Sequence, residues 1–300
     1  MRRLIINADD FGLTSGVNRA IADAHTRGLV TSATLMAGGP AVEEAIRIAL
    51  GAPHLSTGCH VVLVDGSSLL AAREIPTLAA KPDSQGARFR NRLNGFAVRA
   101  LMARLNPEEI EAEAVAQISR LQAAGIAVSH LDTHKHTHMF PVVRRALLRA
   151  ARTCGVMAVR NPFAPSRPMP FLDLSRRPTL WKRYVETRAL RLLATGFRRE
   201  VTQAGMFTTD GSFGIIETGA LDLDLFEDVV ASIPDGTWEF VCHPGYNDAD
   251  LGRVGTRLRD SRLRELEALT SDRARLALEQ RGIELITYRD LVAKMQAPAG

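Results

Sequence analysis

Short apolar runs alternate with amphipathic helical patterns along most of the chain. The apolar runs predict seven strands, near residues 4–8, 29–36, 56–64, 126–130, 156–160, 237–242 and 283–287. Apolar residues at helical spacing predict helices after Ser15 and Pro40, from Asn106 to Gly125 and Pro141 to Gly155, over 223–232 and 257–281, and from Arg289. Strands that alternate with helices indicate one parallel α/β domain, either open or closed.

Polar residues gather after these strands, which favours a closed sheet. In (β/α) barrels the catalytic groups sit at the carboxyl ends of the strands. The predicted fold class is therefore α/β, a (β/α) barrel with about seven parallel strands in a single domain. An open doubly wound sheet is the alternative, but Gly38-Gly39 lacks the G-x-G-x-x-G spacing of its nucleotide-binding fingerprint.

Two long segments have no clear hydrophobic period. Residues 65–106 carry scattered Gly, Pro and Arg, and residues 161–218 are rich in Pro and Arg. We interpret the first as an insertion or lid and the second as another excursion from the same domain. The predicted domain spans 1–296 and includes both insertions, and 297–300 form a tail.

The composition is that of a globular protein, with 46% hydrophobic residues over 300 positions. No apolar run reaches the roughly 18 residues that a membrane span needs. The sequence starts with a charged pair and a strand rather than the apolar segment of a signal peptide, so we expect a cytoplasmic location. Cys59, Cys154 and Cys242 are odd in number and far apart, which is typical of reduced thiols.

The net charge of +5 is modest for this length and does not indicate nucleic-acid binding. Basic residues are concentrated in 176–199, where eight Lys or Arg accompany the single acid Glu186. Apolar residues are interleaved with them over 180–199, so a basic amphipathic helix could contact a membrane surface or an acidic partner. A solvated helix face and a subunit contact in a homo-oligomer are the alternatives.

The candidate site residues follow the predicted strands. They are Asp9 and Asp10 after the first strand, His60 in the third, His134, His136 and His138 after the fourth, Arg160 after the fifth and His243 after the sixth. Carboxylate and imidazole ligands suit a divalent cation such as Zn²⁺, Mn²⁺, Fe²⁺ or Co²⁺. Two or three such ligands with an open position would describe a catalytic site.

Each of these residues also has a purely structural interpretation. One Asp of the Asp9-Asp10 pair could cap the following turn, although adjacent carboxylates raise each other's pKa and a cation would relieve that repulsion. His60 could be an ordinary buried histidine, and His243 could be a turn residue before Pro244-Gly245.

The three histidines after the fourth strand are harder to explain as packing residues. Alternation would place His134, His136 and His138 on one side of an extended segment. They need not all bind one ion, and we expect His136 and His138 to contact the substrate or to support the ligands.

Four short motifs occur in register along the chain. They are Ala8-Asp9-Asp10-Phe11-Gly12-Leu13, Gly58-Cys59-His60, the run from His130 to Pro141, and Cys242-His243-Pro244. Together they resemble the YdjC-like carbohydrate deacetylase family, which includes chitooligosaccharide deacetylase and a hopanoid-biosynthesis-associated branch. The resemblance covers about residues 3–292 and weakens across 65–106 and 161–218.

The resemblance implies a deformed (β/α) barrel that removes an N-acetyl group from an amino sugar with one divalent cation, Mg²⁺ or Zn²⁺. Through the matching motifs, the metal ligands correspond to Asp10, His60 and His134. Asp9 corresponds to the catalytic base. His243 corresponds to a general acid, for which a near-neutral pKa is expected. Arg160 corresponds more loosely to the arginine that orients the base.

The residues after His60 bear on the substrate. The run Val61-Val62-Leu63-Val64-Asp65-Gly66 stands where chitooligosaccharide-type members carry a more polar sequence, and it is similar to the hopanoid-associated branch. With the basic stretch at 180–199, it suggests a glycolipid, with an N-acetylglucosaminyl group on an apolar aglycone. Soluble N-acetylglucosamine oligomers are the alternative small-molecule carbohydrate.

Two other functions fit the same residue types. A metal-dependent hydrolase of a phosphoester or a cyclic amide would commonly hold two metals with a bridging carboxylate. A non-catalytic sugar-binding barrel would need neither a base nor an acid, so the presence of both Asp9 and His243 argues against it.

Overall fold

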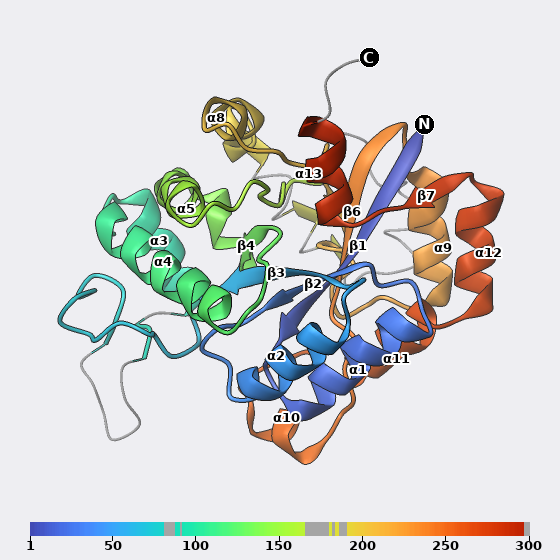
Figure 1. Cartoon of the computed structure of the whole chain (residues 1–300), viewed down its shortest axis with the longest axis horizontal. Coiled ribbons are helices and arrows are strands. Elements are labelled where there is room, and N and C mark those ends of the chain that lie inside the picture. Colours follow the sequence, from blue (N-terminus) through green and yellow to red (C-terminus); the bar gives the residue numbers. More distant parts are fainter. Residues whose placement is uncertain (81–87, 91, 166–179, 182–183, 186–190, 297–300) are drawn as a thin grey trace.

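A parallel sheet of seven strands forms the centre of the molecule (Figure 1). The computed structural model describes residues 1–80, 88–90, 92–165, 180–181, 184–185 and 191–296. The strands are β1 (Arg2–Phe11), β2 (Ser32–Leu35), β3 (Ser56–Val61), β4 (Leu131–Thr133), β5 (Ser212–Phe213), β6 (Gly236–Cys242) and β7 (Ile283–Leu285). Their order is β4-β3-β2-β1-β6-β5, and β7 pairs with the start of β1. The α/β fold class predicted from the sequence is confirmed.

The sheet curls into a half-barrel, and the extended segment 156–160 pairs with β4 on one side and with the residue Phe207, ahead of β5, on the other. Val159 forms a parallel bridge with Leu131 of β4, and Ala158 forms one with Phe207, which precedes β5. The bridging hydrogen bonds run from Arg160 N–H to the Leu131 carbonyl (2.9 Å) and from Val159 N–H to the Phe207 carbonyl (3.0 Å). The strand predicted at 156–160 is thus present only as isolated bridges, and these connect the edges of a deformed barrel.

Helices cover the outside of this sheet. They are α1 (Ser15–Thr26), α2 (Val42–Gly51), α3 (Leu93–Leu101), α4 (Pro107–Ala123), α5 (Pro141–Thr153), α8 (Phe197–Gln203), α9 (Leu223–Ser232), α10 (Ala249–Arg253), α11 (Asp260–Leu269), α12 (Asp272–Gln280) and α13 (Tyr288–Gln296), with the 3₁₀ helices η1 (His134–Met139) and η3 (Arg191–Leu193). In Figure 1, α9 and α12 lie on one side of the sheet and α3, α4 and α5 on the opposite side.

Several helix boundaries follow from local capping chemistry. Thr14 caps α1, because its side chain accepts a hydrogen bond from Val17 N–H. Asn106 caps α4 in the same way, with proline in the first turn. The prediction of one long helix over 257–281 is wrong. The first helix, α11, ends at Leu269, and Ser271 caps a second helix, α12.

The first insertion is anchored by polar residues on the inner face of α4. Gln117 Nε2 donates to the Val62 carbonyl at 2.8 Å, and Glu113 accepts hydrogen bonds from the backbone N–H groups of Leu69 and Leu70 at 2.9 and 3.0 Å. Both α4 side chains are buried, so these contacts are well protected from water. The segment 65–106, predicted as irregular, also contains the helix α3, and 161–218 contains α8 and β5.

Two expectations around β4 are wrong. Residues 126–130 are not a strand, because regular pairing begins only at Leu131. The segment that follows is not extended either: it is the helix η1, in which Lys135 and His136 have left-handed backbone angles with φ of 57° and 53°. The three histidines from 134 to 138 therefore do not alternate along one face.

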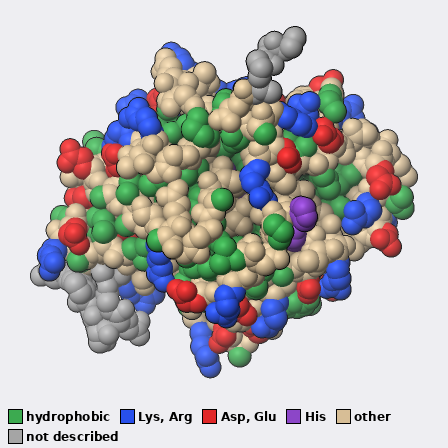
Figure 2. All heavy atoms as spheres, in the orientation of Figure 1, with side chains coloured by type: hydrophobic (Ala, Val, Ile, Leu, Met, Phe, Trp, Pro, Cys, Tyr) green, Lys and Arg blue, Asp and Glu red, His purple; other side chains and the backbone are tan. Residues whose placement is uncertain are grey.

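The distribution of charged side chains on the surface is consistent with the modest net charge. On the face shown in Figure 2, acidic side chains are interspersed among the basic ones. Among the residues that the structure describes, none of the helices combines the length and the apolar composition that crossing a bilayer requires. Within the basic stretch 176–199, predicted as a membrane-surface or subunit contact, residues 176–179, 182–183 and 186–190 lie outside the described residues, as does the tail 297–300. All three cysteines are free, as predicted.

Candidate active site

The two adjacent carboxylates lie at the carboxyl end of β1, where the strand becomes irregular. The register between β1 and β2 shifts between Ala8 and Phe11, and Asp10 has a left-handed backbone with φ of 66°. Neighbouring residues of a regular strand point to opposite faces of the sheet. Because of the shift and the left-handed residue, Asp9 and Asp10 both lie buried in the same polar cluster. Asp is one of the few residue types that tolerate this backbone conformation.

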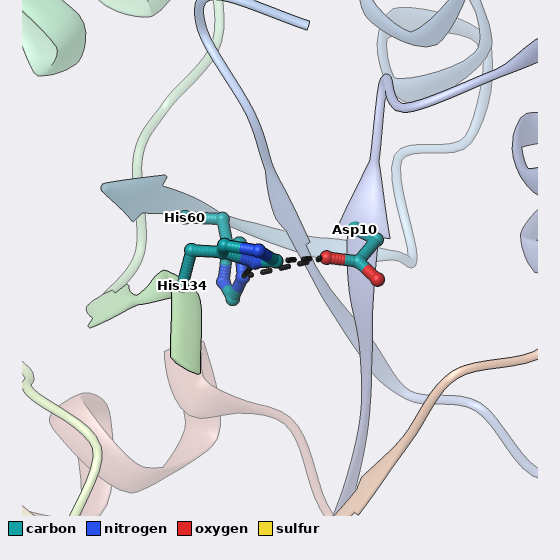
Figure 3. A group of neighbouring side chains, drawn as sticks. All are labelled: Asp10, His60 and His134. Atoms are coloured by element: carbon teal, nitrogen blue, oxygen red, sulfur yellow. Dashed lines mark hydrogen bonds and ion pairs between the residues drawn. The ribbon is translucent and has the colours of Figure 1, made fainter. Parts of the chain in front are cut away.

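Asp10, His60 and His134 converge from β1, β3 and the start of η1 (Figure 3). Asp10 Oδ1 lies 3.3 Å from His134 Nδ1 and 3.6 Å from His60 Nε2, and the two ring nitrogens are 3.2 Å apart. Asp10 Oδ1 is buried and accepts no hydrogen bond from any described residue. One carboxylate oxygen and two imidazole nitrogens facing one point form a donor set that could bind a divalent cation.

The orientation of the His60 ring is fixed by Asp132, a residue that the sequence analysis did not select. His60 Nδ1 lies 2.7 Å from Asp132 Oδ1, which leaves Nε2 directed toward Asp10 and His134. Burial lowers the pKa of His60, but Asp132, Asp9 and Asp10 together raise it to about 9. Because a metal binds the unprotonated nitrogen of an imidazole, a cation would compete with a proton for Nε2 of this ring.

A second group of donors, Asp9, His60 and Asp132, also lies close enough to hold an ion. Arg160 already contacts both of its carboxylates: Nη1 and Nη2 donate to Asp9 at 2.8 and 2.7 Å, and the guanidinium also pairs with Asp132. A cation there would have to displace a buried guanidinium. The Asp10 group is the better candidate, which favours one cation per chain.

Arg160 connects the site to Glu239, in the middle of β6. It is fully buried, and its Nε donates to Glu239 Oε1 at 2.9 Å on β6. Tyr288 and Ser212 donate to the other oxygen of Glu239, at 2.6 and 3.2 Å. Three buried carboxylates, those of Asp9, Asp132 and Glu239, therefore share one guanidinium.

The electrostatics around Asp9 keep it ionised. Burial raises the pKa of this carboxyl, but the guanidinium of Arg160 and the nearby His60 lower it more strongly, to well below its usual value. Asn7 and Thr34 also donate to Oδ1 of Asp9, at 3.0 and 3.3 Å. Asp9 thus presents a charged, firmly oriented carboxylate beside the candidate cation site.

His243 lies on the other side of Asp9. Its Nε2 is 3.9 Å from Asp9 Oδ2, and its Nδ1 is 3.9 Å from Glu265 Oε2. Burial lowers the pKa of His243 to about 4, although Asp9 and Asp10 act in the opposite direction. The near-neutral pKa expected from the sequence is therefore wrong for this structure. Burial raises the pKa of the neighbouring Glu265 to about 7.

The remaining predicted residues lie farther along η1. His138 is fully buried, its Nδ1 lies 2.7 Å from the Thr133 hydroxyl, and its contact with substrate stays a prediction. His136 is partly buried, and its Nδ1 has no hydrogen-bond partner among the described residues. Its contact with substrate stays a prediction.

Access to the site is through two of its histidines. The side chain of His134 is 19% exposed and that of His243 is 10% exposed, whereas those of Asp9, Asp10 and His60 are 4% exposed or less. His134 and His243 are therefore the most exposed of these five side chains, and a substrate would reach the carboxylates past their rings.

Known proteins resemble this chain along nearly its whole length. The family model described as YdjC-like protein matches residues 3–280. Proteins named carbohydrate deacetylase from Brevibacillus brevis and Geobacillus stearothermophilus are 32% and 33% identical to it; each alignment covers 96% of this chain, and 99% and 98% of those proteins.

A solved structure from Enterococcus faecalis V583 has a similar fold. That protein, described as a candidate cellobiose-phosphate cleavage protein, is 27% identical, with a TM-score of 0.75 over 97% of this chain and 98% of its own. The order of motifs, the sheet with the Asp10–His60–His134 cluster at its carboxyl edge and these alignments agree, and the chain belongs to the YdjC-like family.

Proposed function

We propose that this chain is a metal-dependent carbohydrate deacetylase. It would hydrolyse the acetamide of an N-acetylglucosamine-type sugar to a free amine and acetate. The convergence of Asp10, His60 and His134 beside the ionised Asp9 is the observation that supports this most strongly. Curated relatives named carbohydrate deacetylase over nearly the full length supply the reaction class.

The cation would be held by Asp10, His60 and His134. The free Oδ1 of Asp10 and the two imidazole nitrogens fit such an ion, and two nitrogen ligands favour Zn²⁺ over Mg²⁺, which prefers oxygen ligands. When bound, the cation supplies Lewis acidity: it polarises the amide carbonyl and makes water a stronger nucleophile at neutral pH.

The proton transfers are assigned to Asp9 and His243. Asp9 is ionised and can accept a proton from the attacking water, while Arg160 holds its carboxylate in place. His243 is neutral at neutral pH in the resting site, so it must gain a proton before it can donate one. Asp9 Oδ2 and His243 Nε2 lie 3.9 Å apart, which is longer than a hydrogen bond, so the proton would pass from the base to His243 through one bridging water and from there to the departing amine.

The identity of the group attached to the sugar is left to experiment. The apolar run 61–64, which suggested a lipid aglycone, is buried in the hydrophobic core, so packing accounts for its composition. Oligosaccharides and glycolipids therefore both belong in a substrate panel. The cytoplasmic location and the homo-oligomer stay predictions.

The decisive experiment measures acetate release from N-acetylglucosamine oligosaccharides and lipid-linked conjugates, with and without a chelator. Release from at least one substrate, lost with the chelator and restored by Zn²⁺, is the expected result. A protein that carries two metal ions per chain and releases no acetate from any substrate would favour hydrolysis of another bond, such as a phosphoester or a cyclic amide. Full activity after metal removal would exclude the proposed cation.

A further inference from the structure

Two charged residues of opposite sign lie on the inward face of α11, which the sequence indicated only as part of a long charged helix. Arg262 and Glu265 are each 1% exposed, and their spacing of three places them on one face of the helix. Glu265 accepts a hydrogen bond from the backbone N–H of His243 at 2.6 Å. Arg262 donates to Asp10 Oδ2 through Nη2.

Other contacts hold the Arg262 guanidinium in one orientation. Its Nε donates to the Leu258 carbonyl at 3.2 Å, and Nη1 donates to the His243 carbonyl at 3.5 Å. Gly245 N–H in turn donates to the Arg262 carbonyl at 3.1 Å. A Cβ at Gly245 would lie 2.8 Å from Arg262 Cδ, so the loop after β6 packs directly on this side chain. Arg262 therefore connects Asp10 with the segment that carries His243.

The two oxygens of Asp10 have different surroundings. Oδ2 accepts a hydrogen bond from Arg262, whereas Oδ1 faces His60 and His134 without a hydrogen bond. A carboxylate can bind a cation through one oxygen or through both. Because a guanidinium stays protonated at every working pH, Arg262 remains a donor to Oδ2, and Oδ1 is the oxygen that a cation can reach without competing with a hydrogen bond.

We propose that Arg262 is a positioning residue for the cation site. It occupies Oδ2 of Asp10, leaves Oδ1 as a single ligand oxygen, and connects that ligand to the backbone of His243. The inference rests on the metal site proposed above. A buried ion pair with only a structural role would stabilise the fold without changing metal affinity, and the test is designed around this difference.

The chain offers a matched control at Arg144 on α5. Arg144 is 2% exposed and donates through Nε to Glu200 at 2.7 Å. It too is a buried arginine in an ion pair, but its side chain donates to Glu200 and the Leu193 carbonyl rather than to the site. Arg144→Met and Arg262→Met therefore both remove a buried guanidinium, and only the second removes a contact with Asp10.

The experiment titrates Co²⁺ into the full-length wild-type chain, Arg262→Met, Arg262→Lys and Arg144→Met, and follows the visible spectrum of the bound ion. Arg262→Met should weaken Co²⁺ affinity about 10- to 100-fold, as loss of a group that orients a ligand typically does. Its spectrum should change, because Oδ2 becomes free to bind the ion. Arg144→Met should have the Co²⁺ affinity and the spectrum of the wild type. Arg262→Lys keeps the charge but lacks the planar guanidinium, so its Co²⁺ affinity should lie between those of the wild type and Arg262→Met.

Wild-type affinity and an unchanged spectrum in both Arg262 variants would overturn the inference while leaving the metal site intact. A wild-type chain that binds no Co²⁺ would instead overturn the metal site, and the role of Arg262 with it. If Arg262→Met does not fold, the comparison of Arg262→Lys with the wild type decides, because Lys preserves the charge opposite Asp10.

Discussion

Replacing Asp9 with asparagine should separate proton transfer from cation binding. The Asp9 carboxylate accepts two hydrogen bonds from Arg160, at 2.8 and 2.7 Å, and one from Asn7 at 3.0 Å. Asparagine keeps the shape of the side chain and one of its two oxygens, but it carries no charge. Its NH₂ group would face N–H donors such as those of Arg160 and cannot accept their hydrogen bonds. The proposed ligands are Asp10, His60 and His134. Asp9 is not among them, so Asp9→Asn should still bind the cation.

The expected magnitudes follow from these contacts. Loss of a general base typically lowers kcat by roughly 10²- to 10⁴-fold. At about 1.36 kcal/mol per factor of ten, this raises the barrier by about 2.7–5.4 kcal/mol. A buried donor of Arg160 also loses its acceptor, which costs about 1–3 kcal/mol of folding free energy and lowers Tm by a few degrees.

Three measurements on Asp9→Asn test this reasoning: acetate release, metal content per chain and thermal unfolding. Asp132→Asn is the matched comparison, because Asp132 also contacts Arg160 but orients His60. That variant should weaken metal affinity about 10- to 100-fold and recover much of its activity at saturating metal. Activity of Asp9→Asn within a few-fold of the wild type would refute the assignment of Asp9 as the base.

Three further results are expected. His134→Ala should lose both bound metal and acetate release, and wild-type metal content in this variant would remove His134 from the ligand set. Removing the cation with a chelator should lower Tm, since a ligand present at 100 times its Kd adds about 2.7 kcal/mol to the folded state; an unchanged Tm would mean that no cation is bound. Glu265 has a pKa of about 7, raised from 4.5, so the stability that its protonation contributes is full below pH 4.5 and is lost as the pH rises to about 7. Urea unfolding on both sides of this window should show that Glu265→Gln lacks this loss, and an identical pH dependence in wild type and variant would contradict the shifted pKa.

Much of the fold could be predicted because local signals and long-range structure agree. Asn106-Pro107 starts α4 and Pro141 starts α5, where the sequence placed them. The failures occurred where local patterns are weak. β5 is only two residues long, and the segment 156–160 is held by isolated bridges rather than by a regular ladder. Nothing local predicts such pairing, because it depends on barrel closure.

The candidate site could be predicted as far as its motifs reach. Asp10, His60 and His134 do converge, although their roles are still proposals. Arg262 and Glu265 were missed because charged residues on a helix normally indicate a solvated face, and Arg262 meets Asp10 across 252 positions of sequence. The left-handed angles of Lys135 and His136 had no glycine or asparagine to signal them.

The pairing of β1 has a consequence for how an ion enters. β1 pairs with β2, β6 and β7, so exposing its amides to hydrogen exchange requires several strand pairings to separate. His134, by contrast, begins a 3₁₀ turn with poorer hydrogen-bond geometry and two left-handed residues. Local opening therefore starts on the side of His134. We therefore expect amide exchange to be faster in the turn of His134 than in β1, and an arriving ion to meet Asp10 already in place.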